Sequence, residues 1–190
     1  MKGKRLLDLA LLLPLVPLFG LAVGVLALLV LVLDGRPIFF TQPRLGQGRR
    51  VFQIFKLRTM TCEPDMRARR PTRLGGLLRH HGLDELPQLF NVLIGDMSLV
   101  GPRPLTPDDA ERLISAHPPL AARFEVPPGI TGLAQVCQAR GAALTARLDA
   151  EYARNRSATV DIGILIRTTW INVVGKRRGA RPLPPHLVPR

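Results

Sequence analysis

One long apolar segment near the N-terminus constrains the fold of this chain more than any other feature. The 25 residues from Leu9 to Leu33 contain no charged side chain and are mostly Leu and Val. An apolar run of this length is sufficient to enter a lipid bilayer. A signal peptide normally has a shorter apolar core, and no small-residue cleavage site precedes Asp34. The sequence therefore predicts a membrane-associated protein and disfavours a purely soluble nucleic-acid-binding domain.

Two prolines, Pro14 and Pro17, interrupt the apolar segment. A proline inside a helix removes a hydrogen bond and kinks the chain. A break near Pro17 leaves arms of about 12 and 16 residues, and neither spans a hydrocarbon core of about 30 Å. Basic residues flank both ends, and positive charge favours the cytoplasmic side. The pattern fits a re-entrant helical hairpin over residues 1–34, with a kinked transmembrane anchor as the alternative.

The net charge of the 190-residue chain is +13, from 27 Lys and Arg against 14 Asp and Glu. Such a charge predicts an anionic partner, which could be nucleic acid, an anionic membrane surface or a phosphorylated ligand. Nucleic-acid binding favours aromatic side chains on which bases stack, and aromatic residues make up only 5% of this chain. Lipid headgroups and phosphorylated ligands are therefore the favoured partners, and no nucleic-acid partner is expected.

The remaining residues, 35–190, have patterns that predict one α+β domain. Two short strands at 38–41 and 51–55, joined by turn residues at 45–48, predict a small β-hairpin. Helices are predicted at 74–81, 86–93, about 106–117, 144–155 and 161–174. The last helix contains Trp170 and precedes the basic cluster 176–178, which suits an amphipathic helix at a membrane interface. A core helix with a basic tail is the alternative.

Asp84 and Glu85 form the first group of residues that could carry chemistry. Adjacent carboxylates at the start of a helix are commonly helix caps. Here they stand among fixed cations, including an Arg between two prolines; these cations are Lys56, Arg58, Arg79 and Arg103. Carboxylates among such cations indicate a site for a metal-bound phosphate ligand. An Asp can also attack a phosphoryl group and form an acyl phosphate.

The stretches around these residues, LDELPQLFNV at 83–92 and GDMSLVGPRP at 95–104, closely resemble the bacterial sugar transferase family. This family comprises the monotopic phosphoglycosyl transferases. Further matching segments lie at 42–46, 55–60 and 128–136. The resemblance covers nearly the whole chain, from the apolar segment to Asp161 and Ile162.

The resemblance implies transfer of a sugar phosphate from a UDP-sugar to polyprenyl (undecaprenyl) phosphate, with release of UMP. It implies Mg²⁺ as cofactor and a two-step reaction that initiates bacterial surface glycan synthesis. Asp84 is implied as the nucleophile that carries a covalent phosphosugar, and Glu85 as its partner in metal binding or proton handling. The implied phosphate-binding residues are Arg103, Arg79, Lys56 and Arg58.

The resemblance further implies a catalytic domain over residues 35–190 on the cytoplasmic face of the bacterial inner membrane. The re-entrant helix of residues 1–34 would anchor it monotopically among membrane lipids, with its break at Pro17. Two positions depart from the family pattern. Val16 stands where many relatives have Ser, and Cys137–Gly141 replaces a Gly-Arg-Asn-like turn. The alternative functions are a catalytically inactive membrane scaffold and a membrane-anchored nucleic-acid-binding protein.

Overall fold

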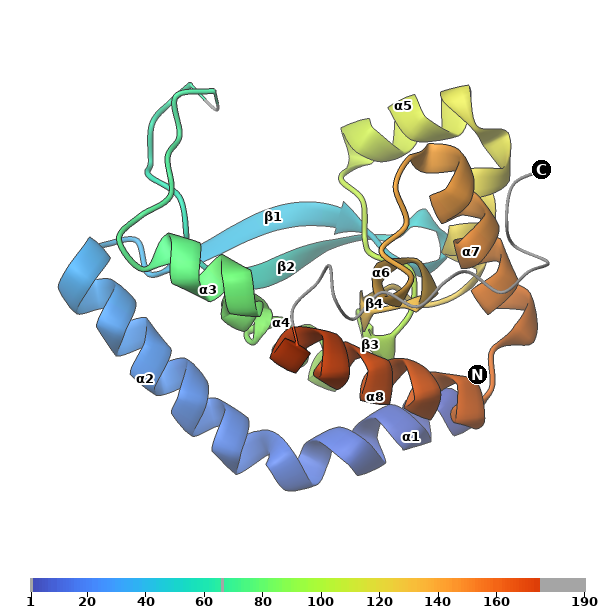
Figure 1. The fold of residues 1–190 in the computed structure, drawn as a ribbon, viewed down its shortest axis with the longest axis horizontal. Coiled ribbons are helices and arrows are strands. Elements are labelled where there is room, and N and C mark those ends of the chain that lie inside the picture. Colours follow the sequence, from blue (N-terminus) through green and yellow to red (C-terminus); the bar gives the residue numbers. More distant parts are fainter. Residues whose placement is uncertain (1, 66, 175–190) are drawn as a thin grey trace.

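The fold, seen in a computed structural model that describes residues 2–65 and 67–174, combines helices with two small sheets (Figure 1). The helices are α1 (Lys2–Leu12), α2 (Val16–Asp34), α3 (Gly75–His81), α4 (Gln88–Ile94), α5 (Pro107–Ala116), α6 (Leu133–Val136), α7 (Ala142–Asn155) and α8 (Ala158–Val174). The strands are β1 (Phe39–Leu45), β2 (Val51–Leu57), β3 (Ser98–Val100) and β4 (Gly129–Thr131). This arrangement confirms the predicted α+β class.

The apolar N-terminal helix is bent where α1 meets α2, so the two arms form a wide V (Figure 1). The bend is a 3₁₀ turn at Leu13–Leu15, and Pro17 lies in the first turn of α2. A proline ring clashes with the carbonyl four residues earlier, which for Pro17 is that of Leu13. The structure therefore places the predicted helix break at Leu13–Leu15, just before Pro17.

The helical segment from Gly3 to Asp34 is long and apolar enough to cross a membrane. Only 6% of its most apolar 18-residue window is buried against the rest of the protein. Burying so much apolar surface against lipid, and removing it from water, is strongly favourable. The exposed helix therefore fits membrane association of the chain.

Both ends of this bent helix contact the same globular region. At the N-terminal end, Lys4 Nζ lies 2.7 Å from Asp161 Oδ2 at the start of α8. At the C-terminal end, Asp34 Oδ1 accepts a hydrogen bond of 3.0 Å from the backbone N–H of Arg73. The helix therefore starts and finishes on one body, and side chains beside its bend also pack against that body, namely Leu12, Val16 and Phe19.

Asp8 makes the first turns of α1 part of the buried interior. Its carboxylate accepts hydrogen bonds from Ser98 Oγ at 2.7 Å and from the backbone N–H of Leu99 at 3.2 Å. Asp8 is only 3% exposed, and Lys4 Nζ lies 3.7 Å from it. These contacts join the polar face of α1 to β3, the strand that leads into the loop carrying Arg103.

The predicted β-hairpin is present, with longer strands than expected. β1 and β2 pair antiparallel in a register that runs from Phe39 opposite Leu57 to Leu45 opposite Val51. Phe52 and Ile54 of β2 face a core cluster beneath α4 and α1. Because Lys56 follows these inward residues on the same strand, the hairpin fixes its position relative to α4.

The second sheet, the parallel pair β3 and β4, was not among the predicted elements. Each strand has three residues, which is too short for the alternation that marks a strand in sequence. The backbones approach so closely here that a Cβ on Gly101 would lie 2.2 Å from the Pro127 carbonyl oxygen. Glycine at this position therefore permits the chain to enter the loop that carries Arg103.

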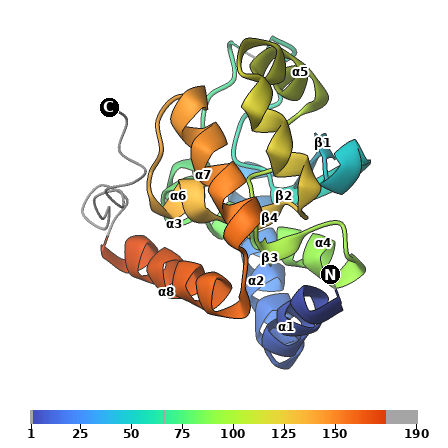
Figure 2. The ribbon, with the colours of Figure 1, turned by 90° about the vertical axis from the view of Figure 1, so that its right-hand side faces the viewer.

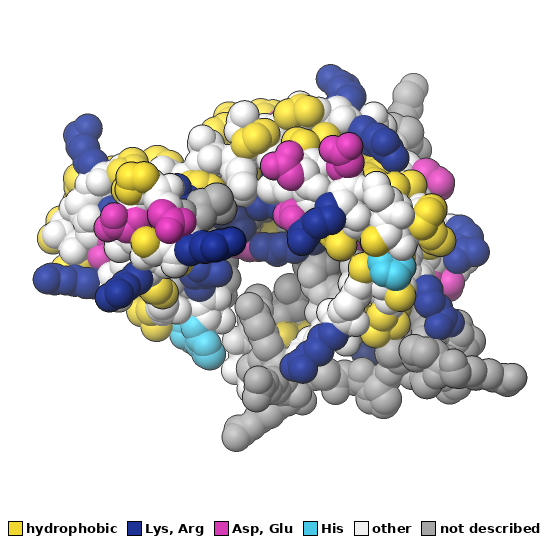
Figure 3. Space-filling view, turned by 90° about the horizontal axis from the view of Figure 1, so that it is seen from above, with side chains coloured by type: hydrophobic (Ala, Val, Ile, Leu, Met, Phe, Trp, Pro, Cys, Tyr) yellow, Lys and Arg dark blue, Asp and Glu magenta, His cyan; other side chains and the backbone are white. Residues whose placement is uncertain are grey.

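α8 has one apolar face in the core and another in solvent. Ile164 and Ile171 pack in the core with Tyr152, whereas the exposed apolar side chains are Ile162, Ile166, Trp170 and Val173. α8 lies at the same end of the molecule as α1 (Figures 1 and 2). The opposite face carries numerous charged side chains (Figure 3). The basic cluster 176–178 lies outside the described residues.

Candidate active site

Asp84 and Glu85 lie in a short 3₁₀ segment, Leu83–Glu85, between α3 and α4. Gly82 ends α3 in the left-handed conformation, with φ of +71°, which lets the chain turn sharply into this segment. Asp84 is buried, with 8% of its surface exposed, and the side chain of Glu85 is 18% exposed. The turn therefore holds two adjacent carboxylates in a largely desolvated position.

Glu85 binds two cations that come from different parts of the fold. Lys56 Nζ, from β2, lies 2.7 Å from Glu85 Oε1. Arg103, from the loop after β3, places Nη2 at 2.5 Å from Oε1 and Nη1 at 3.3 Å from Oε2. Burial by itself would raise the pKa of Glu85, but the charges and hydrogen bonds of Arg103 and Lys56 lower it to about 2. Glu85 therefore stays ionised and holds both cations beside Asp84.

Asp84 is in a different electrostatic state from its neighbour. Burial and the negative charge of Glu85 raise the pKa of Asp84, against the opposing effect of Lys56. Asp84 forms no ion pair with any side chain that the structure describes. A carboxylate with a raised pKa is more basic, and one without an ion pair is free to react or to bind a metal.

Arg79, in the last turn of α3, lies at the edge of this site. Its charge favours the ionised form of Asp84, and its Nη1 lies 3.0 Å from the sulfur of Met60. Its side chain is exposed. The structure thus brings three of the four predicted cations, Lys56, Arg79 and Arg103, to the acidic pair.

Arg58 is the exception among the predicted phosphate-binding residues. Its guanidinium is buried and donates hydrogen bonds to the backbone carbonyls of Asp34 at 2.6 Å, Gly35 at 2.9 Å and Pro37 at 2.5 Å. These carbonyls belong to the end of α2 and the turn that follows, where a cation is favourable. Arg58 therefore holds this helix end in the structure and forms no hydrogen bond or ion pair with Asp84 or Glu85 among the described residues, so its phosphate contact stays a prediction.

Asn91 is a supporting residue that the sequence analysis did not single out. It is fully buried in α4, where Nδ2 donates to the Gln53 carbonyl at 2.7 Å and Oδ1 accepts from the Phe55 N–H at 3.2 Å. These bonds fix α4, and with it the preceding Asp84, against the strand that carries Lys56. The sequence feature that could have identified Asn91 is its position as a polar residue within an apolar stretch of the helix.

The carboxylates of the site fit a partial Mg²⁺ site. Among the described residues, no group of three or more His, Cys, Asp or Glu side chains is placed to hold a metal ion. Mg²⁺ in phosphoryl-transfer sites is commonly held by one or two carboxylates, several waters and the substrate phosphates. Asp84, which forms no ion pair among the described residues, fits as one such ligand, whereas Glu85 would have to share its carboxylate between the metal and its partners Lys56 and Arg103.

Comparison with known proteins places the chain in a family. Residues 1–175 match the family model described as bacterial sugar transferase. The chain is 41% identical over 180 residues to the UDP-glucose:undecaprenyl-phosphate glucose-1-phosphate transferase of Caulobacter vibrioides, covering 87% of this chain and 67% of that protein. It is 42% identical over 192 residues to the undecaprenyl-phosphate glucose phosphotransferase of Komagataeibacter xylinus, covering 88% and 35%.

The name of a third relative gives a different donor sugar. The chain is 35% identical over 178 residues to the UDP-N-acetylgalactosamine-undecaprenyl-phosphate N-acetylgalactosaminephosphotransferase of Aeromonas hydrophila, covering 87% of this chain and 42% of that protein. The chain thus spans about two thirds of the Caulobacter protein and less than half of the other two. On the family match and these identities, the chain belongs to the bacterial sugar transferase family.

Proposed function

We propose that the protein is a phosphoglycosyl transferase that moves a sugar-1-phosphate from a UDP-sugar to undecaprenyl phosphate and releases UMP. The observation that carries this proposal is a buried Asp84 without an ion pair, beside a Glu85 that holds Lys56 and Arg103. The names of the relatives, which describe transfer of sugar phosphates to undecaprenyl phosphate, support it. The reaction would initiate synthesis of a surface glycan.

The proposed reaction has two steps that share one nucleophile. In the first, a carboxylate oxygen of Asp84 attacks the phosphorus bonded to the sugar. A bond from Asp84 to phosphorus forms, the bond to the bridging oxygen breaks, and this oxygen leaves with the electron pair as UMP. In the second, an oxygen of undecaprenyl phosphate attacks the same phosphorus, and Asp84 leaves as a carboxylate. Two bulky anions can therefore use one site in turn.

The cations around the acidic pair support this proposal. Phosphoryl transfer depends mainly on positioning and on neutralisation of charge. The side chain of Arg103 is 51% exposed, so its planar fork can bind phosphate oxygens while still contacting Glu85. Lys56, which pairs with Glu85, and Arg79, whose charge acts on Asp84, add positive charge. Mg²⁺ bound at Asp84 and Glu85 would supply further neutralisation of the diphosphate.

The proposed setting is the cytoplasmic face of the bacterial inner membrane, with residues 1–34 as a re-entrant hairpin. Its support is that both ends of the apolar helix contact one globular region, through Lys4 and Asp34. A straight span would separate these two ends by the thickness of the bilayer. The exposed apolar face of α8, with Trp170, would lie at the interface, so that the site meets the lipid phosphate at headgroup depth.

Cysteine labelling tests this topology. In a background with Cys62→Ser and Cys137→Ser, we expect Gly3→Cys and Arg50→Cys both to react with a membrane-impermeant maleimide only from the cytoplasmic side. Leu18→Cys, near the bend, serves as the control and is expected to remain unlabelled from either side because lipid covers it. Labelling of Gly3→Cys from the periplasmic side would establish a transmembrane anchor instead.

An assay with a panel of radiolabelled UDP-sugars tests the activity. Purified protein with undecaprenyl phosphate and Mg²⁺ is expected to release UMP and to transfer label to the lipid with at least one donor. Omission of the lipid or addition of a chelator should stop multiple turnover. Folded protein that transfers label from no donor in the panel would favour the inactive scaffold.

A further inference from the structure

The loop that carries Arg103 is held through its carbonyl groups. Pro102 and Pro104 have no backbone N–H, so the loop offers few donors with which to fix itself. Its four consecutive carbonyls each accept a hydrogen bond from another part of the chain. The pairs are Gly129 N to Pro102 O at 2.9 Å, Arg123 Nη2 to Arg103 O at 2.8 Å, Arg44 Nη1 to Pro104 O at 3.2 Å and Leu45 N to Leu105 O at 2.9 Å.

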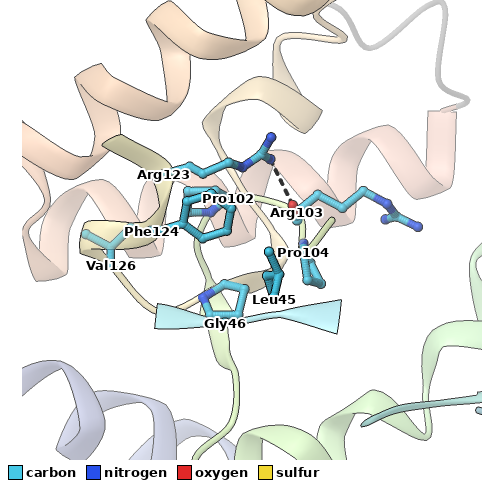
Figure 4. Close-up of a pocket in the computed structure, with 9 residues that line it drawn as sticks. Leu45, Gly46, Pro102, Arg103, Pro104, Arg123, Phe124 and Val126 are labelled. Carbon is cyan, nitrogen blue, oxygen red and sulfur yellow. Dashed lines mark hydrogen bonds between the residues drawn. The ribbon is translucent and has the colours of Figure 1, made fainter. Parts of the chain in front are cut away.

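The donor to the Arg103 carbonyl is itself part of a buried ion pair. Arg123 lies in the 3₁₀ segment Pro118–Glu125 and is 5% exposed. Its Nη2 is 3.1 Å from Oδ2 of Asp149, a residue of α7 that is 2% exposed. Figure 4 shows Arg123 pointing at the Arg103 carbonyl, while the Arg103 side chain extends in another direction. Asp149, Arg123 and Arg103 therefore form one connected series that ends at Glu85.

The presence of the buried Arg123–Asp149 ion pair is not explained by a gain in folding stability alone. Burial lowers the pKa of Arg123 and raises that of Asp149 to about 6, although each charge favours the other. The cost of removing two charges from water often cancels their attraction, so such a pair is weak evidence for a stabilising role. The contact to Arg103 supplies a functional reason for keeping it.

We propose that Arg123 and Asp149 are positioning residues, which fix the backbone at Arg103 so that its guanidinium stays directed at Glu85 and the substrate phosphates. This inference rests on the proposed transfer reaction. Asp149 orients Arg123, Arg123 binds the Arg103 carbonyl, and Arg103 binds Glu85 at 2.5 Å. Because a displacement of about 1 Å at a reacting group can cost about 10²-fold in rate, a backbone contact outside the site can control turnover.

A double-mutant cycle on kcat/KM for the UDP-sugar tests the proposal. Arg123→Met is expected to lower kcat/KM by about 10- to 100-fold. In an Arg103→Met background, the same change should have less than about a twofold effect, because the group that Arg123 positions is already absent. Arg112→Met, which breaks the exposed ion pair with Asp109 on α5, is the matched control and should leave kcat/KM unchanged in both backgrounds.

A purely structural role for Arg123 predicts a different result. Its loss would then lower kcat/KM by the same factor with and without the Arg103 guanidinium, and this outcome would overturn the proposal. Asp149→Asn, which keeps the side-chain volume, provides a second cycle that decides the matter if Arg123→Met does not fold. Thermal unfolding of each variant identifies that case. Inactive wild-type protein with every donor would instead overturn the proposed transfer reaction.

Discussion

Replacement of Asp84 by asparagine is expected to lower UMP release by at least about 10³-fold, because the amide cannot serve as the nucleophile. The substitution keeps the shape of the side chain while removing its charge and its nucleophilic oxygen pair. Initial rates of UMP formation with the preferred UDP-sugar and undecaprenyl phosphate measure the effect. Asp108→Asn, at an exposed carboxylate in the first turn of α5, is the matched control and should retain the wild-type rate.

The fold should survive the Asp84→Asn change. The pKa of Asp84 is raised mainly by burial, so ionising this carboxyl group costs more free energy in the folded protein than in the unfolded chain. A neutral amide removes this cost, and the melting temperature of the variant is expected to equal or exceed that of the wild type. Full UMP release by a folded Asp84→Asn protein would exclude Asp84 as the nucleophile.

Glu85→Gln is expected to have the second-largest effect, a loss of about 10²- to 10³-fold in kcat/KM. Lys56 and Arg103 bind the Glu85 carboxylate at 2.7 and 2.5 Å, and an uncharged amide leaves these two cations without a common counter-charge. Arg103 is then free to leave the position in which it meets the substrate phosphates. Steady-state kinetics with varied UDP-sugar measure the loss, and wild-type kcat/KM in this variant would contradict the role of Glu85.

The same variant should be less stable at neutral pH. The pKa of Glu85 is lowered to about 2, so its contribution to stability is present above about 4.5 and is lost as the pH falls towards 2. Urea unfolding at pH 7 is expected to show a decrease of about 2–3 kcal/mol for Glu85→Gln. The difference from wild type should shrink at pH 3. Asp109→Asn, in an exposed pair, should change stability by less than about 1 kcal/mol.

Local patterns in the sequence were sufficient to predict several elements of the fold. Two short strand-forming runs joined by turn residues predicted the hairpin β1–β2, and helices were predicted where α3, α4, α5, α7 and α8 form. The β3–β4 pair has too few residues to show a period. The docking of α1 through Asp8 was also not predicted, because a lone Asp beside an apolar run carries no signal of the Ser98 hydroxyl that it meets 90 residues away.

The candidate site was also predictable only in part, because local sequence shows the type of a side chain but not its long-range contacts. Asp84, Glu85 and Arg103 stand out in the sequence because a carboxylate pair and an Arg between two prolines are recognisable by residue type. Residues that act through contacts with distant parts of the chain cannot be recognised in this way. Arg58 has the charge of a phosphate-binding residue but holds the carbonyls at the end of α2. Arg123 shows its contact to the Arg103 backbone only when η4 and α7 (segments Pro118–Glu125 and Ala142–Asn155) are folded together.

Intact-protein mass spectrometry tests the proposed reaction most directly. The protein is incubated with its UDP-sugar and Mg²⁺ in the absence of a lipid acceptor. We expect the mass to increase by one sugar phosphate with release of an equivalent amount of UMP, no increase in Asp84→Asn, and loss of the adduct when undecaprenyl phosphate is added. UMP release that requires the lipid, with no adduct at any time, would contradict a covalent intermediate on Asp84.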